Sequence, residues 1–264
     1  MHRYLILFFC LNFTAYVNAD SIVIQSTTST RDSGLYEFLL PNYPSYSDHE
    51  IKVVAVGTGQ AIVNAKNCDG DLLIVHDKDR ETQFIEQGYG IKRHKLMHND
   101  YVVVGPSQDP ANVSSIKIPS DVFLAIANNK SEFISRSDSS GTHFAELAIW
   151  DKANYNPIKS SAVWYFETGQ GMGPSLNIAI AKNAYIFTDR SSWLKYKNKA
   201  NHRILYENKA ELKNEYGLIL VNYNRCKGIN KTVSSDLYDW LRSDMAKKLI
   251  QSYKIDNQQI FFID

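Results

Sequence analysis

The sequence contains little of what marks several classes of protein. Only 3 cysteines, 7 prolines and 13 glycines occur among 264 residues, which excludes a disulfide framework, a collagen-like chain and a proline-rich disordered chain. Neither sign of charge dominates, since 29 lysines and arginines face 28 aspartates and glutamates. The chain therefore has no overall field that would attract nucleic acid or an anionic membrane, while a local anion site remains compatible with it.

Residues 1–19 have the pattern of a secretory signal peptide. Arg3 provides a positive start, an apolar run covers residues 4–13, and small side chains precede a cleavage position after Ala19. The apolar run is too short to cross the roughly 30 Å of a bilayer core, and no later run is long enough. We expect an exported, periplasmic protein that begins at Asp20.

The cysteines leave one question open. Cys10 lies in the signal peptide, and the large Phe9 before it speaks against lipid anchoring. Cys68 and Cys226 remain in the mature chain, far apart in sequence. An oxidising compartment permits a disulfide between them, but two separate thiols fit the sequence equally well.

Short apolar runs alternate with helical patterns along the whole mature chain, whose hydrophobic content of 44% suits a large core. Continuous apolar strands between amphipathic helices predict an α/β fold with mainly parallel sheets covered on both faces. The expected strands lie at 22–24, 51–56, 72–75, 101–104, near 133 and 163, at 184–187 and at 216–222. We expect one lobe from residues 20–105 plus 202–264 and a second from 106–201, with crossings near Gly105-Pro106 and Asn201-His202.

Hydroxyl-rich or glycine-rich turns follow three of the expected strands. They are Thr27-Thr28-Ser29-Thr30, Gly57-Thr58-Gly59 and Ser139-Ser140-Gly141-Thr142. The start of a helix offers free backbone N–H groups and a favourable dipole to an anion, and ligands of open α/β sheets bind at the carboxyl ends of strands. For each turn taken alone, a helix N-cap is the favoured explanation. Three together indicate a shared anion site.

Arg136 stands just before the third of these turns. Its guanidinium could offer a fixed fork of donors to an oxyanion. The alternative is a surface arginine paired with Asp138, and the residues alone leave both readings open.

Catalytic and metal readings find less support in the sequence. An exported hydrolase using Ser140 with His143 or His76 lacks the Gly-x-Ser-x-Gly elbow. His94 and His98 have helical spacing, but the apolar run that follows them favours a strand. We find no spacing typical of metal ligands and no phosphate loop.

Several ordered blocks together resemble the tungstate-binding receptors of bacterial ABC transporters, the TupA-type periplasmic proteins. The main blocks are Thr-Thr-Ser-Thr-Arg-Asp-Ser-Gly-Leu at 27–35, Val-Gly-Thr-Gly-Gln-Ala at 56–61, Asn-Asp-Tyr-Val-Val-Val-Gly-Pro at 99–106 and Ser-Arg-Ser-Asp-Ser-Ser-Gly-Thr-His at 135–143. Shorter blocks are Gly-Asp at 70–71, Val-His-Asp at 75–77, Gly-Met-Gly at 171–173 and Thr-Asp-Arg at 188–190. Ser137 stands where the family pattern often has glycine.

The resemblance implies a two-lobed periplasmic binding protein that closes on a tetrahedral oxyanion and has no enzymatic activity. It implies a monomer without cofactor or metal cation that delivers tungstate to a membrane permease with a cytoplasmic ATPase. Molybdate or a general oxyanion is the alternative ligand, because molybdate has nearly the same size and charge as tungstate, whereas sulfate is an equally charged but smaller dianion. A ligand sensor without transport is a further alternative. The binding residues implied are Thr28, Ser29, Thr58, Arg136, Ser139, Ser140, Gly141, Thr142, Met172 and Arg190.

Overall fold

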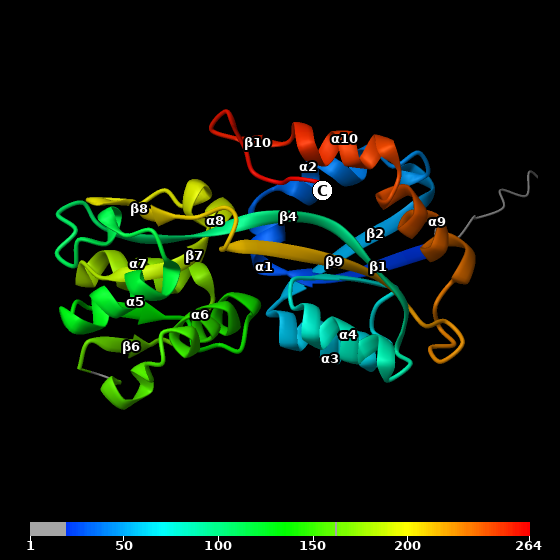
Figure 1. The fold of residues 1–264 in the computed structure, drawn as a ribbon. Coiled ribbons are helices and arrows are strands. Elements are labelled where there is room, and N and C mark those ends of the chain that lie inside the picture. Colours follow the sequence, from blue (N-terminus) through cyan, green and yellow to red (C-terminus); the bar gives the residue numbers. More distant parts are fainter. Residues whose placement is uncertain (1–19, 162) are drawn as a thin grey trace, which may run out of the picture.

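The computed structural model describes residues 20–161 and 163–264. The expected signal peptide, with Cys10, lies outside them. Figure 1 shows two α/β lobes that are joined by the long strands β4 (Gly90–Pro106) and β9 (Lys213–Val221). The path through the sheet is β2-β1-β3-β9-β4-β7-β5-β6, with β8 paired to β4. The expected α/β class is confirmed.

The first lobe surrounds the strands at one end of this path. β1 (Asp20–Thr27) lies parallel to both β2 (His49–Val56) and β3 (Leu72–Val75), and β9 lies antiparallel between β3 and β4. In Figure 1, α3 and α4 cover one face, while α2, α9 and α10 cover the other. These helices and the short α1 are Thr28–Asp32 (α1), Leu35–Leu39 (α2), Thr58–Lys66 (α3), Lys78–Glu86 (α4), Lys231–Leu241 (α9) and Asp244–Ser252 (α10).

Alternation along the buried strands explains why both faces are covered. In β3, Leu72 and Ile74 belong to the core that includes α9 and α10, whereas Leu73 and Val75 belong to the core that includes α3. Successive side chains of a strand point to opposite faces, so a wholly apolar strand requires helices on both sides. Cys68, after α3, forms a disulfide with Cys226, after β9, with the two Cα atoms 5.3 Å apart. This decides the question that the sequence left open.

The second lobe surrounds the other end of the sheet. β5 (Phe133–Ser135) lies parallel to β6 (Tyr165–Glu167) and β7 (Tyr185–Asp189), and β4 lies antiparallel to β7 and β8 (His202–Glu207). Its helices are Pro119–Asn128 (α5), Gly141–Lys152 (α6), Met172–Lys182 (α7) and Arg190–Lys195 (α8). The remaining elements are the 3-10 turns Leu40–Asn42, Tyr46–Asp48, Val113–Ser115 and Pro157–Ser160 and the small hairpin β10 (Lys254–Ile255) and β11 (Gln258–Gln259).

The chain crosses between the lobes at other places than expected. β4 pairs with β9 up to Asp100 and with β7 and β8 from Tyr101 onward. β8 therefore belongs to the second lobe, although residues from His202 onward were expected in the first, and the return crossing comes between β8 and β9. The expected strand near Val163 begins at Tyr165. Among the described residues, no helix has the length and apolar character needed to cross a membrane.

Candidate anion-binding site

The carboxyl ends of the parallel strands of both lobes meet between the lobes. A Cβ atom added to Gly141, at the start of α6, would lie 2.6 Å from His76 Cε1, directly after β3. A Cβ added to Gly59, in the first turn of α3, would lie 3.6 Å from the carbonyl oxygen of Ser139. The turns after β2 and β3 therefore touch the turn after β5, so three separate parts of the sequence converge on one place.

Thr58 is the first residue of α3 and lies deep in this region. Its side chain is 0% exposed, and Oγ1 has no hydrogen-bond partner among the described residues. Gly57 before it supplies no side-chain cap, so the first N–H groups of α3 are not satisfied by a capping side chain. A buried hydroxyl and a helix start without a cap are together suited to an anion.

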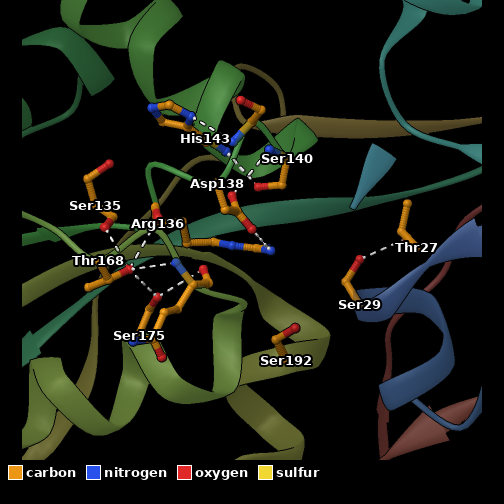
Figure 2. A network of polar contacts seen from close by, with 12 residues as sticks. Thr27, Ser29, Ser135, Arg136, Asp138, Ser140, His143, Thr168, Ser175 and Ser192 are labelled. Atoms are coloured by element: carbon orange, nitrogen blue, oxygen red, sulfur yellow. Dashed lines mark hydrogen bonds and ion pairs between the residues drawn. The ribbon is translucent and has the colours of Figure 1, made fainter. Parts of the chain in front are cut away.

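The turn after β1 brings a second set of hydroxyls to the site. Thr28 is half-buried at the start of α1, and Ser29 is buried. Ser29 Oγ lies 3.2 Å from Thr27 Oγ1, which in turn lies 3.0 Å from Thr30 Oγ1. In Figure 2 the Arg136 guanidinium extends from the second lobe toward α1, where Ser29 lies.

Arg136 is paired with Asp138 and also keeps a donor for an anion, so it shows features of both alternatives that the sequence left open. It is paired with Asp138 through Nη2, yet it is only 4% exposed and its Nε has no partner among the residues described. Asp138 also accepts a hydrogen bond from Ser140 N at 3.2 Å. The carboxylate of Asp138 thus fixes the guanidinium from one side and leaves its buried Nε free for another acceptor (Figure 2).

The backbone of this turn is built around two left-handed residues. Ser137 has φ of 45° and Ser139 has φ of 57°, a conformation that glycine adopts with less strain. The family pattern's glycine at position 137 thus has a conformational reason. Ser137 Oγ donates to Glu167 Oε1 at 2.9 Å and so ties the turn to the end of β6.

The start of α6 supplies the remaining predicted residues. Ser140 is the N-cap, and its Oγ accepts from His143 N at 3.3 Å. Thr142 is 1% exposed, and its Oγ1 has no hydrogen-bond partner within the described part of the chain. Gly141 is buried against His76, whereas Ser139 is exposed. Ser140 therefore acts as a cap and Thr142 as the free donor of this turn.

A polar group beneath these turns was missed by the site prediction. The Tyr101 hydroxyl lies beside Thr142, donates to Asn214 Oδ1 at 2.9 Å and lies 3.1 Å from His76 Nδ1. Asn214 also donates to the Tyr216 hydroxyl at 3.1 Å. Tyr101 and Asn214 come from the crossing segments of β4 and β9, and only their meeting in space could reveal their role.

These buried groups are neutral at physiological pH. Burial lowers the pKa of His76 from 6.5 to about 4, and the nearby Arg136 lowers it further against the opposing effect of Asp189. Burial also raises the pKa of Tyr101 and Tyr216 far above the usual value. The floor of the site therefore adds dipoles but no charge, and the cation of the predicted binding set that reaches it is Arg136.

Two further predicted residues, Arg190 and Met172, have partners of their own. The Arg190 guanidinium binds Asp100 with Nε and Nη2, at 2.8 and 2.5 Å, and is also paired with Glu207. Two of its three nitrogens are thereby engaged by carboxylates at the crossing. Met172 is buried at the start of α7 and lines a cavity of about 220 Å³ between α1, α7 and α8, with Asp32 and Ser192. The backbone N–H of Gln170, two residues before Met172, donates to the Arg136 carbonyl at 3.2 Å, so the segment that leads into α7 contacts the Arg136 turn.

The hydrolase geometry does not form. Among the residues described, no hydrogen bond joins Ser140 Oγ to an imidazole; His143 Nδ1 accepts from Ser139 N at 3.3 Å, and His76 is bonded to Tyr101. Nor do residues 20–161 and 163–264 hold a cluster of three or more side chains suited to a metal cation. What the site offers is donors: two buried hydroxyls, a guanidinium and helix-start N–H groups.

Known proteins share this sequence and fold. The family model for the PBP superfamily domain matches residues 15–251. Tungstate-binding protein TupA from Peptoclostridium acidaminophilum is 39% identical over 236 residues, covering 88% of this chain and 81% of that protein. The crystal structure of the tungstate ABC transporter from Geobacter sulfurreducens has a TM-score of 0.81 at 36% identity, covering 89% of this chain and 100% of that one. Tungstate-binding protein TupA from Desulfovibrio alaskensis G20 has a TM-score of 0.80 at 34% identity, covering 93% and 99%.

Proposed function

This chain belongs to the PBP superfamily and within it to the tungstate-binding receptors of ABC transporters, and we propose that it captures tungstate between its two lobes and delivers it to a membrane permease. The family resemblance seen in the sequence is thereby confirmed. The family consists of solute receptors, not enzymes.

One observation carries the assignment of the site. Thr58 Oγ1, Thr142 Oγ1 and Arg136 Nε are all buried, and none has a partner in the described parts of the chain. A buried polar group without a hydrogen bond costs about 1–3 kcal/mol of folding stability. Three such donors from two lobes at one place are best explained by an anion that accepts from all of them.

The donor set suits a fully deprotonated tetrahedral oxyanion. Tungstate carries no proton near neutral pH, so each of its oxygens can accept a hydrogen bond and none needs an acceptor. Asp138, the carboxylate paired with Arg136, already accepts from Arg136 and Ser140, so it orients donors instead of facing the ligand. Closure removes water from around the anion and strengthens each charge-assisted hydrogen bond.

The cellular location and the partners of the receptor follow from the same assignment. We expect an exported, periplasmic monomer that is cleaved after Ala19. Its partners are a membrane permease and the ATPase that drives it. No nucleic acid and no cofactor take part.

Elemental analysis and competition titration together test the proposal. Native mass spectrometry of the purified chain should detect a bound tungsten oxyanion, and calorimetry should rank tungstate above sulfate and phosphate. Equal affinity for molybdate would broaden the ligand to both metal oxyanions. Preferential binding of phosphate or sulfate, or no binding of any of the four, would refute the assignment.

A further inference from the structure

A contact between an arginine and an aromatic ring connects the two lobes next to the anion site. The Arg80 guanidinium carbon of α4 lies 4.0 Å from the centre of the Phe144 ring of α6. α4 belongs to the first lobe and α6 to the second. Attraction between a guanidinium and a ring face requires this short separation, so the contact exists only while the lobes are together.

Arg80 is positioned for this contact from its own lobe. Its Nε lies 3.4 Å from Asp77 Oδ2, and its backbone N–H donates to Asp77 Oδ1 at 3.1 Å. A Cβ added to Gly59 would lie 3.0 Å from Arg80 Nη1. The absence of a side chain at position 59 thus leaves the guanidinium room over the first turn of α3.

Both members are next to residues of the anion site. Phe144 follows Thr142 by two positions in the first turns of α6, and Arg80 lies over the turn that begins with Thr58. A movement that separates the ring from the guanidinium therefore also separates the two unpartnered hydroxyls. The contact and the anion favour the same arrangement of the lobes.

We propose that Arg80 and Phe144 form an interlobe clasp that favours the closed receptor and slows release of the bound anion. The proposal rests on the proposed function. Because the clasp differs in energy between closed and open forms, it shifts the population toward the closed one. A cation–π contact of this kind corresponds to about a 3- to 10-fold change in an equilibrium constant. Arg80 and Phe144 are positioning residues, since neither is required to touch the ligand.

Two single variants and their combination test the clasp. Phe144→Leu keeps an apolar side chain but removes the ring face, and Arg80→Lys keeps the charge but removes the planar guanidinium. We expect each to raise the Kd for tungstate about 3- to 10-fold in calorimetry, chiefly through a faster dissociation rate in stopped flow. The double variant should bind tungstate about as tightly as the single variant with the higher Kd, because either substitution alone already removes the shared contact.

A matched control exists within one lobe. The Arg225 guanidinium carbon lies 3.7 Å from the centre of the Tyr89 ring, and both residues belong to the first lobe. Tyr89→Leu should lower the melting temperature while leaving the Kd and dissociation rate unchanged. Any of three results would overturn the clasp. The Kd of Phe144→Leu could be unchanged, the effects of the two clasp substitutions could multiply in the double variant, or Tyr89→Leu could raise the Kd as much as Phe144→Leu does.

A readout without ligand separates failure of the clasp from failure of the proposed function. If the parental chain binds no oxyanion, the proposed function fails. The clasp is then judged by amide hydrogen exchange at residues 57–60 and 139–143 of the ligand-free chain. Faster exchange in Phe144→Leu than in the parental chain supports the contact between lobes, and equal exchange refutes it.

Discussion

Replacing Thr58 by valine should stabilise the free protein and weaken binding at the same time. The Thr58 hydroxyl is fully buried without a partner, and valine keeps the branched shape while removing the polar atom. Relief of the desolvation cost should raise the unfolding free energy of the ligand-free chain by about 1–2 kcal/mol. Loss of one hydrogen bond to a charged ligand should cost about 1.5–3 kcal/mol of binding, or roughly 10- to 150-fold in Kd.

Urea denaturation of the ligand-free chain and calorimetry with tungstate measure the two effects separately. Thr188→Val is the matched control, because Thr188 is also fully buried but its hydroxyl donates to the Asp189 carbonyl at 3.2 Å. That variant should lose about 1 kcal/mol of stability and keep its affinity. If Thr58→Val destabilises the chain and binds tungstate as the parental chain does, the buried hydroxyl has no ligand role and the reasoning fails.

Substitutions at three further positions probe the second lobe. Arg136→Ala should weaken binding more than about 100-fold and Arg136→Lys by about 10-fold, because lysine keeps the charge without the fork of donors; calorimetry measures both, and near-parental affinity for the alanine variant would remove Arg136 from the site. Ser137→Gly should keep the Kd for tungstate within about twofold. Ser137→Val should lower the unfolding free energy by about 1–2 kcal/mol in urea denaturation, since a β-branched residue strains the left-handed turn. Equal stability of the glycine and valine variants would contradict this strain. Burial raises the pKa of Glu146 from 4.5 to about 7, so the folded chain keeps a proton that the unfolded chain loses, and the stability of the parental chain falls as the pH rises from about 5 to 8. Glutamine does not titrate, so the unfolding free energy of Glu146→Gln relative to the parental chain should increase by about 2–3 kcal/mol between pH 5 and pH 8. A difference that does not change with pH would contradict the shifted pKa.

The strand-to-helix turns could be predicted because their signals are local. A run such as 72–75 is apolar at every position, which predicts a strand covered on both faces, and the Gly-Thr-Gly at 57–59 marks where the next helix begins. Parallel strands place such turns at one edge of a sheet. This geometry led to the expectation that the turns at 57–59 and 139–142 converge, whereas the individual binding residues Thr58 and Thr142 were implied by the family resemblance.

The crossings could not be predicted because they depend on pairing between distant segments. β4 continues from Gly90 through a charged stretch to Pro106, and nothing local shows where its partner changes from β9 to β8. The role of Arg190 depends on the same crossing. Its guanidinium contacts Asp100 of β4 and Glu207 of β8, and the resemblance that implied a binding role for Arg190 could not show this pairing.

Arg136 and Arg190 differ in how many carboxylates surround them, which bears on the proposed role of Arg136. Both are buried and both are paired with carboxylates, so burial and charge do not separate them. Arg190 directs two nitrogens to Asp100 and one of these also to Glu207, which leaves two negative charges against one positive charge and opposes an added anion. Arg136 meets one carboxylate and keeps a buried Nε without a partner. Under the proposed function, Arg136 is therefore the better candidate for holding an oxyanion, because it is paired with one carboxylate and Arg190 with two.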